Sequence, residues 1–177
     1  MKPLATIKPL ALVGMMGSGK STVGALVAQH IGCAYVDLDV LLEKRLGDSI
    51  AHVFSLQGEP FFRQQEHLAL GWVMEHLPVP YVLATGGGTP LNPVNAEWLR
   101  SRFFTVWLDA AAPLLYERAA LPHRPLAAFG ALAFYRLASD RQSHYRGVAQ
   151  WRIDVSESTP EALADAVARR WKGEENG

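Results

Sequence analysis

The sequence of 177 residues contains very little cysteine, and this excludes two kinds of stabilising element. Cys33 is the only cysteine, so the chain can form neither an intramolecular disulfide nor a cysteine-based zinc site. The six histidines show no spacing typical of metal ligands, and we expect them to be surface or core residues. With 49% apolar residues, a chain of this length can bury a sizeable core without such cross-links.

Long hydrophobic runs are also absent from the sequence. The longest apolar stretch, residues 126–135, is about half the ~20 residues needed to cross a bilayer, so we expect no membrane span. Residues 1–9 contain two lysines and two prolines but no continuous apolar segment, unlike a signal peptide. We therefore expect a cytoplasmic protein, and a monomer is the expected state.

Neither sign of charge predominates, because 17 Lys and Arg residues balance 17 Asp and Glu residues. The chain thus lacks the broad basic surface that nucleic acids require, and nucleic acid is not an expected partner. The distribution is nevertheless uneven, since residues 100–152 contain eight arginines and three acidic residues. Arginine suits bidentate binding of phosphates or carboxylates, although for most of these eight a solvated helical face is the favoured interpretation.

Short apolar runs alternate with helical patterns along the chain. The runs predicted to be strands are 10–13, 34–37, 81–84, 103–108 and 152–155. Most are continuously apolar, as is typical of parallel strands buried on both faces. Helices are predicted over Ser21–Ile31, Pro60–His76 and Pro160–Trp171, the last with Ser158 and Glu161 at capping-box spacing. This alternation predicts an α/β fold whose ligands bind at the carboxyl ends of the strands.

A glycine-rich loop follows the first predicted strand. Residues 14–21, GMMGSGKS, match the pattern GxxxxGK[ST] between a strand and a helix, the context of a phosphate-binding loop. Backbone N–H groups and the start of the helix would face the phosphates. Lys20 would reach the β and γ oxygens, and Ser21 would offer its hydroxyl to Mg²⁺. The residues expected to bind ATP in this segment are Gly17, Ser18, Gly19, Lys20, Ser21 and Thr22.

Two aspartates follow at the end of the second predicted strand. Asp37 ends the strand and Asp39 comes two residues later, a spacing that directs both to one side. A magnesium–nucleotide site requires a carboxylate opposite Ser21, which this pair can supply. Alternatively, either aspartate could cap a helix beginning near Val40. Small GTPases use similar parts but add an Asn-Lys-x-Asp motif, which this sequence does not contain.

Two further patterns indicate a second substrate. The triplet Gly86-Gly87-Gly88 follows the third predicted strand. There it permits close approach to the backbone and leaves N–H groups to bind an anion or a hydroxyl. Alternatively, the triplet forms only a tight turn. Arg63 and Glu66 lie three residues apart and share one helix face, as surface ion pairs commonly do.

Taken together, these residues resemble shikimate kinases, P-loop kinases with the nucleoside-monophosphate-kinase fold. The resemblance covers about residues 10–168. Its motifs, in order, are the phosphate loop, Asp37-x-Asp39, Gly58-Glu59 with Phe62-Arg63 and Glu66, Gly86-Gly87-Gly88, Arg124-Pro125-Leu126, and Arg141 with Tyr145. It implies one kinase domain over 1–177, with a five-stranded parallel sheet of order 2-3-1-4-5, helices on both faces, a shikimate-binding segment at about 40–70 and a lid at about 118–130.

The resemblance also implies an activity and a role for each matched residue. The activity is ATP-dependent phosphorylation of the 3-hydroxyl of shikimate, a step in aromatic amino acid biosynthesis that uses Mg²⁺. Asp37 would hold the water shell of Mg²⁺, and Asp39 would face the accepting hydroxyl. Arg63 and Arg141 would clamp the substrate carboxylate, with Glu66 orienting Arg63 and the amides of 86–88 lining the pocket. The lid arginine Arg124 would meet the transferring phosphoryl group, which makes Lys20, Asp39 and Arg124 the expected catalytic residues.

The sequence departs from the family pattern in three places. Ser143 and His144 stand where the family usually has proline and leucine, so we expect a different turn after Arg141. The lid is slightly shorter than in relatives, and Ala127 replaces a leucine. Residues 156–159 offer no arginine for the adenine, so backbone groups or Arg118 would contact the nucleotide there.

Two other functions agree with parts of the sequence. A kinase for a small polyol or sugar acid, such as gluconate, shares the fold but lacks the glycine triplet combined with the Arg63–Glu66 pattern. A regulator that binds nucleotide without turnover does not need Lys20, Asp39 and the arginines together.

Overall fold

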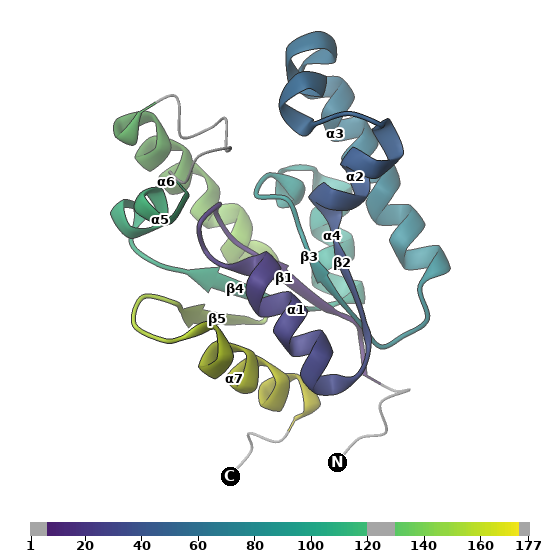
Figure 1. Ribbon diagram of the computed structural model, residues 1–177, viewed down its shortest axis with the longest axis vertical. Helices are drawn as coiled ribbons and strands as arrows, with labels where there is room; N and C mark the ends of the chain where they lie inside the picture. Colours follow the sequence, from purple (N-terminus) through teal and green to yellow (C-terminus); the bar gives the residue numbers. More distant parts are fainter. Residues whose placement is uncertain (1–6, 120–129, 174–177) are drawn as a thin grey trace.

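The computed structural model describes residues 7–119 and 130–173 (Figure 1). At its centre is a parallel sheet of five strands in the order β2-β3-β1-β4-β5, which confirms the predicted topology. The strands are β1 (Leu10–Val13), β2 (Ala34–Asp37), β3 (Tyr81–Ala84), β4 (Phe104–Asp109) and β5 (Trp151–Asp154). The bounds of β1, β2 and β3 match the prediction, whereas β4 and β5 are each displaced by one residue.

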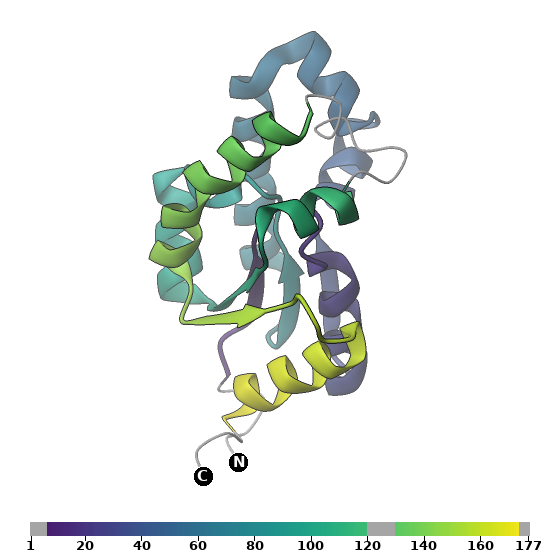
Figure 2. The ribbon, with the colours of Figure 1, turned by 90° about the vertical axis from the view of Figure 1, so that its left-hand side faces the viewer.

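The side chains of the strands alternate between two apolar layers. Leu10 and Leu12 of β1 belong to the layer formed with α1 (Lys20–Ile31) and α7 (Pro160–Lys172). Ala11 and Val13 belong to the opposite layer, formed mainly with the helices that follow β2 and β4. Both layers exclude water, which explains why β1 and β3 are continuously apolar. Figure 2 shows α1 and α7 on one side of the sheet and α6 on the other.

The layer opposite α1 and α7 contains six elements. They are α2 (Leu38–Leu46), α3 (Ile50–His76), the 3₁₀ helix η2 (Thr89–Leu91), α4 (Pro93–Arg102), α5 (Ala112–Ala119) and α6 (Ala131–Val148). The predicted helix Pro60–His76 is the second part of α3, because the helix starts at Ile50 and is interrupted at Gly58. Gly58 has φ 79° and ψ 171°, a backbone conformation available to glycine and strained for other residues. Figure 1 shows α2 and α3 together at one end of the molecule.

Two local expectations are wrong. The residue that caps α7 is Thr159, whose hydroxyl accepts from the backbone N–H of Ala162 at 3.2 Å, and not Ser158. Pro160 occupies the first helical position, where its missing N–H has no cost, and this makes the preceding residue the cap. Ser143 and His144 lie inside α6, which continues to Val148, so the chain makes no turn after Arg141.

The predicted lid lies largely beyond the described part of the chain. Residues 120–129, which include His123 and Arg124, are outside the described residues, so the predicted roles of Arg124-Pro125-Leu126 are not located. Within the described residues, no helix is both long and apolar enough to cross a membrane.

Candidate active site

The phosphate loop joins β1 to α1 at the carboxyl end of the central strand. Lys20 Nζ donates to the carbonyl oxygens of Gly14 at 2.9 Å and Met15 at 3.1 Å, so the amine lies across the loop. A Cβ on Gly17 would lie only 2.3 Å from the carbonyl oxygen of Leu115, which shows how closely the loop packs against α5. The Ser18 hydroxyl is buried without a hydrogen-bond partner among the described residues, so this loop can accept an anionic group.

Asp37 both faces Ser21 and caps a helix, the two arrangements that the sequence left open. Its Oδ2 accepts from the Ser21 hydroxyl at 2.6 Å, and its Oδ1 accepts from the backbone N–H groups of Asp39 and Val40, which caps α2. We expected strand alternation to direct Asp37 and Asp39 to one side. Alternation does not apply here, because β2 ends at Asp37 and α2 begins at Leu38. Asp39 therefore occupies the first turn of a helix.

Asp39 is a half-buried carboxyl group between charges of both signs. Burial raises its pKa from 3.8 to about 6, and the neighbouring Asp37 and Glu66 carboxylates add to the increase. The cations Lys20 and Arg63 oppose the increase. The group is thus ionised at neutral pH but is a stronger base than an ordinary aspartate.

Each glycine of the triplet 86–88 is approached by different charged side chains. A Cβ on Gly86 would lie 2.7 Å from Glu66 Oε1 and 2.8 Å from Asp39 Oδ1. A Cβ on Gly87 would lie 3.3 Å from Arg141 Nη1, and one on Gly88 would lie 2.3 Å from Arg63 Nη2. The triplet also forms a turn, since Thr89 N–H donates to the carbonyl oxygen of Gly86. This turn is where the polar groups of α2, α3 and α6 converge.

The Arg63–Glu66 pair is not a surface ion pair. Arg63 Nη1 donates to Glu66 Oε2 at 2.8 Å, and the Glu66 side chain is fully buried. The second Glu66 oxygen accepts from the Thr89 hydroxyl at 2.6 Å. Arg63 Nε also donates to Glu59, whose side chain is 59% exposed. The pair therefore belongs to the interior of the site, and Thr89 is a member that the sequence analysis did not single out.

Arg141 approaches the glycine turn from α6 at Gly87, next to Gly88, which Arg63 approaches from α3. Its side chain is buried, its Nε has no hydrogen-bond partner and no carboxylate pairs with it among the described residues. Its Nη1 contacts Met15 Sδ at 3.9 Å. Burial raises the pKa of the neighbouring Tyr145 to about 12, so that hydroxyl stays protonated and donates to the carbonyl oxygen of Gly87 at 2.6 Å. A buried guanidinium without a counter-charge is the group that an anionic ligand would complete.

Arg118 lies at the loop that follows β5. Its Nη1 donates to the carbonyl oxygen of Val155 at 2.9 Å and its Nη2 to that of Ser156 at 3.1 Å. This is the segment in which the sequence lacks an arginine of its own, so Arg118 supplies the guanidinium from α5.

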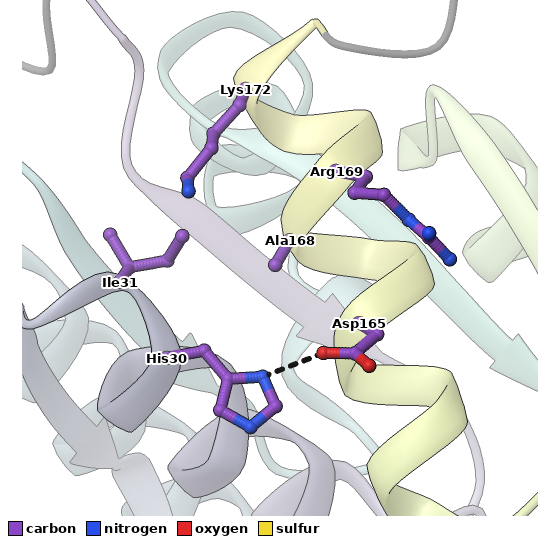
Figure 3. Close-up of a pocket in the computed structure, with 6 residues that line it drawn as sticks. All are labelled: His30, Ile31, Asp165, Ala168, Arg169 and Lys172. Atoms are coloured by element: carbon purple, nitrogen blue, oxygen red, sulfur yellow. Dashed lines mark ion pairs between the residues drawn. The ribbon is translucent and has the colours of Figure 1, made fainter.

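A hollow of about 430 Å³ lies away from these residues, between the end of α1 and α7 (Figure 3). Its lining residues are His30, Ile31, Asp165, Ala168, Arg169 and Lys172. His30 Nδ1 and Asp165 Oδ1 are 3.1 Å apart across it. The hollow is roughly 15 Å from the phosphate loop along α1 and contains none of the predicted site residues, so we do not assign the chemistry to it.

Comparisons with known proteins agree with this arrangement. The family model described as shikimate kinase matches residues 16–172. The shikimate kinase of Marinomonas sp. (strain MWYL1) is 36% identical over an alignment of 172 residues that covers 93% of this chain and 94% of that protein. The shikimate kinase of Symbiobacterium thermophilum is 38% identical over 166 residues, covering 90% and 91%. A solved structure of shikimate kinase from Acinetobacter baumannii in complex with shikimate has a TM-score of 0.89 and 29% identity, with 98% of each chain covered. By the match of fold, motifs and sequence, the chain belongs to the shikimate kinase family.

Proposed function

We propose that this chain transfers the γ-phosphoryl group of ATP to the 3-hydroxyl of shikimate, with the residues around the glycine turn as the acceptor site. The observation that carries the proposal is the buried Arg141, which lacks a counter-charge in the described residues and approaches the same glycine turn as Arg63. Burying a cation beside a neutral acceptor would leave its charge uncompensated. An acceptor with a carboxylate supplies that charge.

The donor side would be the phosphate loop. The amides of 17–19 and the Lys20 amine would bind the phosphates, with Ser18 and Thr22 at the same end of α1. Ser21 and, through water, Asp37 would hold Mg²⁺, because a hydroxyl and a carboxylate are the oxygen donors that this ion prefers. Bound Mg²⁺ would neutralise charge on the phosphates. Arg118, and Arg124 from the lid, complete the proposed nucleotide contacts.

The acceptor side would hold shikimate by its carboxylate. Arg63 uses Nη1 for Glu66 and Nε for Glu59, and a guanidinium has five N–H donors in all. Its Nη2, which lies against Gly88, remains for the substrate together with Arg141. Two guanidinium groups from different helices would fix both the position and the tilt of the ring.

Asp39 would accept the proton of the attacking hydroxyl. Its carboxylate lies against Gly86 in the same turn, and its raised pKa of about 6 makes it a better base while leaving it ionised at neutral pH. Phosphoryl transfer needs alignment and neutralised charge more than covalent help, and Lys20 and the two arginines supply both. The monomeric state and the cytoplasmic location remain predictions.

The test is a coupled assay of ADP release with shikimate, quinate, gluconate and the methyl ester of shikimate. We expect shikimate to be the preferred acceptor, with the ester about 30-fold to 150-fold lower in kcat/KM because it lacks the charge. Equal rates with gluconate would indicate a sugar-acid kinase. Equal rates with the ester would refute the assignment of the two arginines to a carboxylate.

A further inference from the structure

Glu66 is a fully buried carboxylate whose two oxygens have different partners. Oε2 accepts from Arg63 Nη1 at 2.8 Å, and Oε1 accepts from the Thr89 hydroxyl at 2.6 Å. The second distance is typical of a hydrogen bond from a hydroxyl to an ionised carboxylate, which is stronger than one between neutral groups. A buried carboxylate needs both partners, since an oxygen without a donor carries the full cost of its lost hydration.

Thr89 is fixed in place by burial and by hydrogen bonds of its backbone. Its side chain is fully buried, its N–H donates to Gly86, and its carbonyl oxygen accepts from Asn95 Nδ2 at 3.3 Å. Asn95 is also fully buried, and its Oδ1 is 2.7 Å from Nδ1 of His67, whose ring stacks on Trp98. These contacts link η2, α3 and α4, so the Thr89 hydroxyl is a donor in a fixed place.

The two hydrogen bonds determine how Glu66 presents Arg63. Thr89 holds Oε1, the oxygen near Gly86, and the guanidinium of Arg63 donates to Oε2. Without the hydroxyl, the carboxylate could turn and offer both oxygens to Arg63, and the guanidinium would leave its place against Gly88. We infer that Thr89 is a positioning residue of the acceptor site, which fixes Glu66 and thereby the direction in which Arg63 meets the substrate carboxylate.

This inference rests on the proposed function, since it requires that Arg63 binds the acceptor. The substitution Thr89→Val keeps the shape of the side chain and removes the donor. We expect it to raise the KM for shikimate about 10-fold, with a smaller change in kcat and the KM for ATP within about twofold of the original. Thr89→Ser restores the donor and should return the KM for shikimate to within about threefold of the original value.

Thr105→Val is a matched control. Thr105 of β4 is also fully buried, and its hydroxyl donates to the backbone carbonyl oxygen of Leu99 at 2.6 Å. A loss of stability alone would affect both valine variants alike, and melting temperatures measure it. Only the Thr89 variant should change the KM for shikimate. Thr89→Ala gives the same test if valine prevents folding, and calorimetric binding of shikimate gives a readout independent of turnover.

A double substitution tests whether Thr89 acts on shikimate binding through Arg63. In an Arg63→Ala background, Thr89→Val should have almost no further effect on shikimate, because the group that it positions is gone. Full additivity of the two losses, or an unchanged KM for shikimate in Thr89→Val, would overturn the inference. Absence of shikimate phosphorylation by the original chain would instead overturn the proposed function, so the two failures are distinguishable.

Discussion

Replacing Gly88 with alanine tests the close packing of Arg63 against the glycine turn. The backbone at Gly88 has φ −105° and ψ −2°, which alanine adopts without strain, so the substitution acts through its methyl group. That group would lie 2.3 Å from Nη2 and 2.5 Å from Cζ of Arg63. Ordinary contact begins at 3.4 Å, so the guanidinium has to move by about 1 Å.

A displacement of this size is expected to be small for stability and large for catalysis. The end of a flexible side chain can make room, so the free energy of unfolding should change by only about 1 kcal/mol. The melting temperature should therefore change by only a few degrees. A misplacement of about 1 Å in a positioning group can cost about 100-fold in rate, which corresponds to about 2.7 kcal/mol. We expect a decrease of that size in kcat/KM for shikimate, with the KM for ATP nearly unchanged.

The assay is coupled ADP release, with shikimate varied at saturating ATP and then the reverse. Gly147→Ala is the control, because Gly147 lies in α6 and a Cβ there would meet nothing within 4 Å. That variant should gain about 0.5–1 kcal/mol of stability and keep its activity. If Gly88→Ala retained kcat/KM within about threefold, the guanidinium position would not matter and the reasoning would be refuted.

Three further substitutions test the remaining groups. Lys20→Ala should lower phosphoryl transfer at least about 100-fold while the circular dichroism spectrum stays the same, and activity within a few fold of the original would contradict its role. Arg141→Ala should lower kcat/KM for shikimate about 30-fold to 150-fold but have little further effect on the methyl ester, so additive losses would exclude a shared carboxylate. Asp39→Asn should lower kcat more than it raises the KM for shikimate, because an amide cannot accept the proton. In the absence of nucleotide and Mg²⁺, the stability of the same variant should also differ from that of the original chain. Since the pKa of Asp39 rises from 3.8 to about 6 on folding, the folded state binds this proton more tightly, and the side chain lowers stability as the pH rises through that interval. Asp39→Asn should therefore be more stable than the original chain near neutral pH by up to about 3 kcal/mol, and the difference should vanish below pH 4; thermal melts across the pH range measure it.

The parts of the fold that the sequence predicted well are those with local causes. Continuous apolar runs mark β1 and β3 because these strands are buried on both faces. The phosphate loop also has a local cause, since its glycines and Lys20 all lie within the short segment 14–20. The start of α7 at Pro160 is correctly predicted, but its cap is not, because Ser158 and Thr159 are both good caps and only the position of Pro160 decides between them.

The parts that the sequence could not settle depend on contacts between distant segments. Helical spacing places Arg63 and Glu66 on one face, but it cannot tell whether that face is covered. Coverage comes from the turn at 86–88 and from Thr89, which is 23 residues beyond Glu66. A lone threonine after a glycine triplet has no distinctive pattern, so only its hydrogen bond to a buried carboxylate reveals it.

The division of the core by the sheet has a consequence for how acceptor specificity can evolve. The helix that begins at Lys20 is supported from one side, together with α7, whereas α2, α3 and α6 are supported from the other. The strands separate the two layers, so a substitution inside one layer has little direct contact with the other. Asp39, Arg63 and Arg141 all come from helices of one layer, so a change of acceptor can arise by substitutions in that layer while the packing of α1 against α7 stays the same.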